Sequence, residues 1–404
     1  MKKSLKAIWF SAAASELGGA FFTFCNSVLI YKLTGSATTL GLVWLIYYIP
    51  SFIMQLFIGP YIDRWSRKRT MMYCHLIRAC LAFTLSVTLM MGVFSIGFIF
   101  IVQIIVGIIM PIFTPANQAI LPTIIEKDQL AKANSVLDSI RQVMAIMGPV
   151  LAGILVEVID ITWILLIISL VFLISTISLL KVNENFSSQQ IRKPWLVDFK
   201  HGLQSYFQHS LIVWLGFFFG FVQFGVGVTT VTTLPFITNV LDLPYSAYGV
   251  FMSGFPIGYL VGALLNAKLS KSKGLGILFS SLFIGGCTYI SLSLTPWFIL
   301  AIFTECIAGI VIAIFNIYNI TLIQQTIPNN IMGKVTSVRL LIMRTMLPLG
   351  ILCAAFCVNY IPIRGMYFII GTIICVTSVL GYFYIKNKNS LVILASVENR
   401  IGDG

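Results

Sequence analysis

Twelve apolar segments of about 20 residues or more recur along the 404 residues of this chain. A helix needs about 20 largely apolar residues to cross a bilayer. Each segment must be helical, because lipid offers no partner to an unpaired peptide group. The sequence therefore predicts an all-α integral membrane protein with twelve transmembrane helices. Their predicted positions are 8–31, 40–62, 70–92, 95–118, 136–158, 161–181, 210–238, 246–268, 275–294, 297–322, 336–358 and 364–385.

Composition argues against the soluble classes of protein. Hydrophobic residues make up 58% of the chain and charged residues only 10%, whereas an average soluble chain carries about 25% charged residues. Such a chain cannot cover its own surface in water, which argues against a soluble enzyme, a disordered hub and a nucleic-acid-binding protein. The eight cysteines lie in apolar stretches without a C-x-x-C pair, so no disulfide framework, metal site or cofactor is predicted.

Lysine and arginine residues predict the orientation of the chain. Of the 26 basic residues, 21 lie at the termini or in connections on one side of the predicted spans, two on the other side and three inside spans. Cytoplasmic connections carry the excess of Lys and Arg in membrane proteins. We therefore expect a multi-pass membrane protein with both termini in the cytoplasm. The formal net charge of +13 is explained by this topology.

The two halves of the chain resemble one another. At an offset of 202 residues, residues 131–136 align with residues 333–338, and Asn117 aligns with Asn319. Repeated halves around a substrate site near the middle of the membrane are typical of secondary transporters. The predicted organisation is an N-terminal six-helix bundle, a cytoplasmic linker, a C-terminal six-helix bundle and a cytoplasmic tail, at 1–181, 182–209, 210–385 and 386–404.

A motif between the second and third predicted spans carries a resemblance to a known family. Residues 59–69 read Gly-Pro-Tyr-Ile-Asp-Arg-Trp-Ser-Arg-Lys-Arg. This pattern resembles the loop signature of the major facilitator superfamily, with Ser66 where a second glycine is usual. The resemblance implies the major facilitator fold, with two pseudo-symmetric six-helix halves, and a latch on the cytoplasmic side. The expected gate residues are Gly59, Asp63, Arg64, Arg67, Arg69 and Asp138.

Two further segments resemble a particular branch of this superfamily. Residues 115–122 and 130–134 look like the bacterial macrolide-efflux (Mef-like) branch, and siderophore exporters contain similar segments. Gly148, Pro149 and Gly153 resemble the end of the antiporter motif, which has a glycine at the position of Ala152. The resemblance implies a monomer that exports macrolide-like or other amphipathic drugs in exchange for protons. Export of a siderophore or other metabolite is an alternative, and a polytopic membrane enzyme or sensor is a more distant one.

Ionisable residues inside predicted spans are candidates for the transport site, because they are costly in a membrane. Glu16 lies about 12 Å into the first span, and Glu305 lies about 14 Å into the tenth. We interpret both as proton-binding groups, with a neutral or paired structural acid as the alternative. Asn26, on the first span, is a further candidate for the substrate site.

Three arginines also fall inside predicted spans. Arg141 lies three residues after Asp138, so the two share a helix face and are expected to pair. Arg344, about 14 Å into the eleventh span, is a candidate partner for Glu305. Arg78 is expected to be structural, bonded to carbonyl groups or to the end of the second span, because the third span packs on the outer side in this family.

The predicted topology is tested with reporters that are active only outside the cytoplasm. A fusion after Lys388 should give no signal, and a fusion near Leu243 should give a strong one, because the basic residues hold their connections in the cytoplasm. The reverse pattern would overturn the topology.

Overall fold

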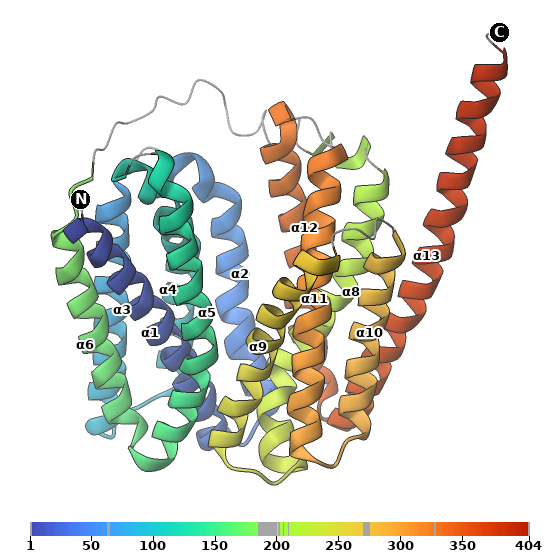
Figure 1. Cartoon of the computed structure of the whole chain (residues 1–404). Helices are drawn as coiled ribbons and strands as arrows, with labels where there is room; N and C mark the ends of the chain where they lie inside the picture. Colours follow the sequence, from blue (N-terminus) through green and yellow to red (C-terminus); the bar gives the residue numbers. More distant parts are fainter. Residues whose placement is uncertain are drawn as a thin grey trace. The chain divides into compact units, whose positions relative to one another are not determined.

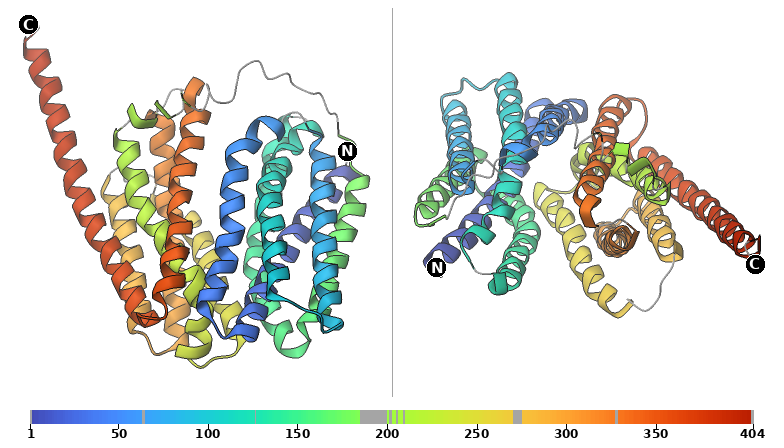
Figure 2. Two further views of the ribbon diagram at one scale, coloured as in Figure 1. Left: turned by 180° about the vertical axis from the view of Figure 1, so that it is seen from behind. Right: turned by 90° about the horizontal axis from the view of Figure 1, so that it is seen from above.

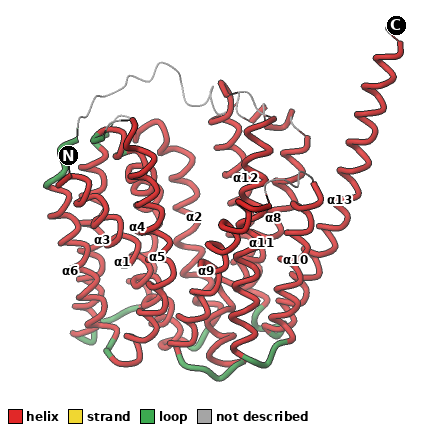
Figure 3. Tube along the Cα trace, in the orientation of Figure 1, coloured by secondary structure: helices red, strands yellow, loops and turns green. Residues whose placement is uncertain are grey.

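The computed structural model describes residues 2–62, 65–125, 127–184, 200, 203–204, 206–208, 210–269, 275–326 and 329–402. In these residues the backbone is helical apart from short connections, and it contains no strand (Figure 3). The helices are α1 (Lys2–Thr34), α2 (Ala37–Ile62), α3 (Arg67–Met90), α4 (Ile96–Ala119), α5 (Lys127–Val158), α6 (Ile161–Leu180), α8 (Ser210–Pro235), α9 (Tyr245–Leu269), α10 (Leu275–Leu294), α11 (Phe298–Thr326), α12 (Asn329–Cys357) and α13 (Ile363–Gly402). A 3₁₀ turn (Leu121–Thr123) and a π-helical turn (Phe236–Val240) complete the described elements.

Eleven of the helices are long and apolar enough to cross a membrane within the described part of the chain. They coincide with eleven of the predicted spans. The predicted span at 336–358 falls on α12, in which the qualifying apolar stretch is the shorter segment Arg344–Cys357. Several side chains of α12 are not among those that the structure describes. A count of twelve transmembrane helices in two halves therefore stays a prediction.

The chain forms two compact units (Figures 1 and 2). Unit 1 contains residues 1–195, 227–256 and 348–360, and unit 2 contains residues 196–226, 257–347 and 361–404. This grouping differs from the predicted division at the central linker, because unit 1 includes parts of α8, α9 and α12. The predicted division into six-helix halves stays a prediction.

Helix α1 is the centre of unit 1, where it packs against α5 and α6. Helices α3 and α6 pack on one another, as do α2 and α4. At the end near the N-terminus, the Ser4 hydroxyl donates to the carbonyl oxygen of Lys181 (3.4 Å) and accepts from the Asn183 N–H (3.4 Å). The beginning of α1 and the end of α6 therefore lie at the same end of unit 1, as expected for an even number of spans between them.

Close helix packing in unit 2 depends on glycine. In α9, a Cβ on Gly258 would overlap the carbonyl oxygen of Cys306, and a Cβ on Gly262 would lie 2.5 Å from the carbonyl oxygen of Ile310. Both oxygens belong to the backbone of α11. Small residues permit this approach between membrane helices.

Replacement of Gly258 tests this packing. The Gly258→Ala variant should lower the thermal midpoint of the purified protein, with a loss of about 1–3 kcal/mol, because a backbone carbonyl cannot move aside as a flexible side chain can. Gly276→Ala is the matched control, since a Cβ there meets nothing within 4 Å. Equal midpoints for the two variants would contradict this account.

Candidate functional site

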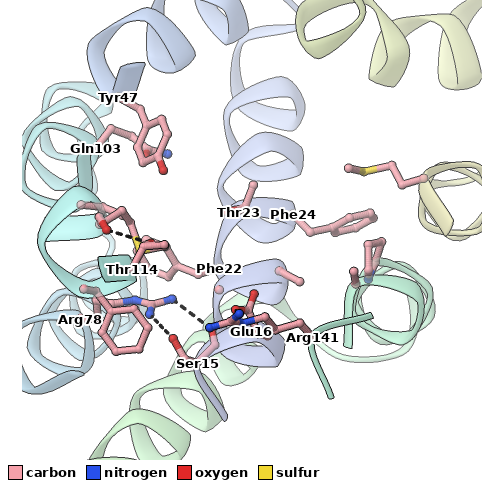
Figure 4. A pocket seen from close by; sticks show the side chains of 18 of the residues that line it. Ser15, Glu16, Phe22, Thr23, Phe24, Tyr47, Arg78, Gln103, Thr114 and Arg141 are labelled. Carbon is pink, nitrogen blue, oxygen red and sulfur yellow. Dashed lines mark hydrogen bonds and ion pairs between the residues drawn. The ribbon is translucent and has the colours of Figure 1, made fainter. Parts of the chain in front are cut away.

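Unit 1 contains a cavity of about 310 Å³ (Figure 4). Helices α1 to α5 and α9 supply its walls. Most of the lining side chains are apolar or aromatic, and charged groups gather at one end. The polar and charged lining residues are Ser15, Glu16, Thr23, Arg78, Gln103, Thr114, Asn117 and Arg141.

Arg78 is a deeply buried cation in the wall of this cavity. Its side chain extends from α3 and is 3% exposed. The guanidinium donates from Nη1 to the Ser15 hydroxyl (3.0 Å) and from Nη2 to the Ser15 carbonyl oxygen (3.4 Å). Its Cζ atom lies 4.1 Å from the centre of the Phe172 ring, a cation–π arrangement. All of these partners are neutral.

Two consecutive glycines in α1 make room for this arrangement. A Cβ on Gly18 would lie 2.9 Å from the Phe172 ring, and a Cβ on Gly19 would lie 2.8 Å from Nη2 of Arg78. Gly19 follows Ser15 by four residues, so both face α3 from the same side of α1. The sequence Ser-Glu-Leu-Gly-Gly therefore provides both the hydrogen-bond acceptors and the space for Arg78.

A second polar layer lies next to the first. The imidazole Nε2 of His75 lies 3.1 Å from the Ser11 hydroxyl oxygen, which also accepts from the Ser175 hydroxyl (3.0 Å). All three side chains are buried. His75 precedes Arg78 by three residues, and Ser11 precedes Ser15 by four. The two layers therefore tie α1 to α3, and both also reach α6, the first through Phe172 and the second through Ser175.

Glu16 and Arg141 form a loose ion pair in the cavity. Arg141 Nε lies 3.8 Å from Glu16 Oε1, and Arg141 Nη1 lies 3.2 Å from Asp138 Oδ1. The second contact confirms the predicted pairing of Asp138 with Arg141. The Glu16 side chain is 41% exposed. Figure 4 shows Arg141 and Arg78 approaching the same region of α1 from opposite sides.

The sequence hypothesis for Arg78 is partly wrong. Arg78 does bond to a carbonyl group, as expected, but it also lines the cavity and interacts electrostatically with Glu16. Sequence depth shows how far a residue lies from the membrane surface and says nothing about the side of the helix on which it lies.

Four further cavity residues were missed by sequence reasoning: Trp44, Tyr47, Gln103 and Asn117. The rings of Trp44 and Tyr47 meet edge to face, with centres 6.0 Å apart. Gln103 and Asn117 are buried polar residues of α4. Asn117 had a signal in the sequence, because it aligns with Asn319 of the second half, and both are 1% exposed.

The other predicted binding residues lie outside this cavity. Asn26 of α1 is 1% exposed, and neither of its amide atoms has a hydrogen-bond partner in the described part of the chain. In unit 2, Glu305 of α11 is partly buried and Arg344 of α12 is exposed. Among the described residues, the ion pairs do not join Glu305 to Arg344.

The predicted gate motif is only partly visible. Asp63 and Arg64 lie outside the described residues, and Gly59 lies in the last turn of α2. Ser66 caps α3 by accepting from the Arg69 N–H (3.2 Å), and its hydroxyl donates to Glu184 Oε2 (2.5 Å). Serine at this position, where the family pattern has glycine, therefore has a structural role.

Glu184 completes this cap from the far end of unit 1. Its carboxylate also accepts from the backbone N–H groups of Arg67 (2.9 Å) and Lys68 (3.1 Å). A carboxylate is favourable here because the first N–H groups of a helix have no intrahelical partner and carry partial positive charge. The basic loop motif is thereby fixed to the segment that follows α6.

The antiporter-like motif lies where α5 packs closely on two other helices. A Cβ on Gly148 would lie 2.6 Å from the Cβ of Ala20 in α1. A Cβ on Gly153 would lie 3.3 Å from the Cα of Gly249 in α9, and Gly249 lies directly against the carbonyl oxygen of Pro149. The motif residues therefore permit close approach of backbones.

The chain is similar to known proteins in both sequence and fold. The family model for the Major Facilitator Superfamily matches residues 8–350. Macrolide efflux protein A of Streptococcus pyogenes is 24% identical, over 94% of this chain and 95% of that protein. The Staphyloferrin A transporter of Staphylococcus aureus is 25% identical, over 88% and 89%. The crystal structure of the nucleoside transporter NupG is similar in fold, with a TM-score of 0.73 at 16% identity, over 96% and 99% of the two chains.

Loss of the Glu184 carboxylate should loosen the start of α3. In Glu184→Ala, hydrogen exchange at the amides of Arg67 and Lys68 should accelerate by about tenfold, because hydrogen bonds to a charged group are lost. The Gly97 amide, which donates to Ser95 at the start of α4, is the internal control and should exchange at its original rate. Unchanged exchange at Arg67 and Lys68 would contradict the cap.

Proposed function

The chain belongs to the major facilitator superfamily, and on that premise we propose that it is a secondary active transporter that exports amphipathic small molecules in exchange for protons. Macrolide-like compounds or several classes of drug are the proposed substrates. The protein would act by alternating access, as a monomer in the bacterial cytoplasmic membrane with both termini in the cytoplasm. Membership of a transporter superfamily supports transport and argues against an enzyme.

The observation that carries the proposal is a titratable carboxylate inside a largely apolar cavity. Glu16 is 41% exposed there, and its contact with Arg141 is long at 3.8 Å. Arg141 is held more closely by Asp138 (3.2 Å). Because Arg141 keeps this second partner, it stays paired when Glu16 takes up a proton. These features suit a group that gains and loses a proton during transport.

The packing of α5 supports a role for the antiporter-like motif in alternating access. Gly148 and Gly153 lie at close contacts with α1 and α9, and small residues allow helices to rock against one another with little rearrangement. We place the cytoplasmic latch at the loop motif with Asp63, together with Asp138. Glu305 is the proposed proton carrier of the second half.

Export of a siderophore or other endogenous metabolite is the second candidate. Similarity to a protein named Staphyloferrin A transporter favours it, at an identity close to that of the macrolide efflux protein. The two candidates share the fold, the cavity and proton coupling, and they differ in the compound transported.

Flux in proteoliposomes tests the proposed coupling. Under an imposed pH gradient, the wild type should accumulate the macrolide erythromycin or a smaller amphipathic compound, the amino acid 2-naphthylalanine. Glu16→Gln should lower that accumulation by about tenfold or more while still binding the compound, because the amide keeps the shape of the acid without its titration. Glu305→Gln and the double variant are measured in the same way.

Asp160→Asn is the matched control. Asp160 precedes α6 outside the membrane spans, and hydrogen bonds from the hydroxyl and backbone N–H of Thr162 hold the pKa of its carboxyl below the usual range. It therefore stays charged and carries no proton, so its variant should transport at the wild-type level. Wild-type accumulation by the double variant would exclude Glu16 and Glu305 as proton carriers.

A further inference from the structure

The charged groups around the cavity pair unequally. Two cations, Arg78 and Arg141, face two carboxylates, Glu16 and Asp138, so the formal charges sum to zero. Arg141 is closer to Asp138 (3.2 Å) than to Glu16 (3.8 Å). When Arg141 is assigned to its closer partner Asp138, the cavity keeps one cation that has no ion pair among the described residues and one anion that has only the 3.8 Å contact. They are Arg78 and Glu16.

Arg78 has unused capacity for an anion. A guanidinium offers five N–H donors in a planar fork, and the acceptors found in the described residues are two oxygen atoms of Ser15. Its Nε is buried and has no hydrogen-bond partner there. None of its bonded partners carries a negative charge: they are the neutral dipoles of Ser15 and the Phe172 ring, and Glu16 acts on the guanidinium without a hydrogen bond. A carboxylate is the group that this fork binds best.

Glu16 offers the complementary charge. It follows Ser15 directly on α1, so its carboxylate faces the cavity next to the residue that binds the guanidinium of Arg78 from α3. It is far more exposed than Arg78, and a ligand can therefore reach it. The groups that face Glu16 are Arg141 from α5 and Arg78 from α3.

We propose that the cavity binds an amphipathic zwitterion, with its carboxylate at Arg78, its ammonium at Glu16 and its apolar part against the aromatic wall. This rests on the proposed transport function and narrows the substrate class. The wall is formed by side chains such as Phe22, Phe24, Trp44 and Tyr47. At about 310 Å³, the cavity lies at the lower end of the range for small-molecule sites, about 300–1,000 Å³.

The arrangement also explains how a proton and the substrate exchange. A deprotonated Glu16 attracts the ammonium group of the ligand. When a proton binds to the Glu16 carboxylate, that attraction is lost and the ammonium is released with its own proton retained. The proton and the substrate therefore compete for one carboxylate, which is the requirement for exchange.

Four derivatives of one compound distinguish the contribution of the carboxylate to binding from that of the ammonium. The probes are 2-naphthylalanine (zwitterion), its N-acetyl derivative (carboxylate only), its amide (ammonium only) and its N-acetyl amide (neutral). Binding to the purified full-length protein in detergent is measured by equilibrium dialysis. The wild type should bind the zwitterion about tenfold or more tightly than each other form, because each loses a hydrogen-bonded charge.

Variants should remove one preference each. Arg78→Gln should bind the zwitterion and the amide equally, while it still prefers the zwitterion to the N-acetyl derivative. Glu16→Gln should show the opposite pattern. Gly19→Ala covers the case in which Arg78→Gln does not fold, because the added Cβ displaces the guanidinium and keeps its charge. It should reduce the same preference as Arg78→Gln.

Gly97→Ala is the control for a glycine of unit 1 away from the cavity. It should bind the four probes as the wild type does, since a Cβ there meets only Ser95 Oγ at 3.5 Å.

The proposal would be overturned if the wild type bound all four probes equally or failed to bind the zwitterion. It would also be overturned if the variants lost both preferences or neither. Zwitterion preference without accumulation under a pH gradient would refute the transport function alone. Coupled transport of erythromycin without zwitterion preference would refute only the assignment of substrate class.

Discussion

The burial of Arg78 against α1 is the interaction on which unit 1 depends. A guanidinium inside a membrane protein is costly unless its donors are occupied, and here a hydroxyl, a carbonyl group and an aromatic ring provide the stabilisation. Each partner requires close contact between helices. Gly19 lets α3 approach α1, and Gly18 leaves space for the Phe172 ring of α6. The neighbouring layer of Ser11, His75 and Ser175 joins the same three helices. One buried cation thus constrains the packing of α1, α3 and α6.

The same constraint shapes the cavity. Because the Arg78 fork is held at Ser15, the adjacent Glu16 carboxylate is left with the longer contact to Arg141. Asp138, one turn before Arg141 on α5, balances that arginine. The protein therefore holds two opposite charges in a low-dielectric cavity without joining them in a tight ion pair. A tight pair would be stable and inert, whereas separated charges keep their capacity for a ligand and a proton.

Sequence reasoning predicted features that depend on local pattern. Hydropathy predicted the positions of the helices, and helical spacing predicted the pairing of Asp138 with Arg141. The distance of Glu16 from the membrane surface along the first span made it a candidate site residue. Features that depend on distant contacts were not predictable. A bond from Arg78 to a carbonyl group was predicted, but its place in the cavity wall and its partners Ser15 and Phe172 were not, because they lie on other helices. Glu184 and Ser66 are 118 residues apart, and a basic loop alone does not indicate which carboxylate will cap it. Gln103 of α4 had no signal that set it apart from other polar residues in an apolar segment, whereas Asn117 was marked by its alignment with Asn319.

The charge of the substrate determines what a proton at Glu16 can do. Protonation raises the net charge of the cavity by one, so it favours an anion at Arg78 and disfavours a cation at Glu16. A purely anionic substrate would therefore bind together with the proton, and the two would travel in the same direction. A cationic group would compete with the proton, and the two would exchange. Arg78 keeps its positive charge whether or not Glu16 is protonated, so it attracts a carboxylate in both states. A zwitterion uses both residues. Its carboxylate binds to Arg78, and its ammonium competes with the proton, so that Glu16 holds either the substrate or the proton at one time.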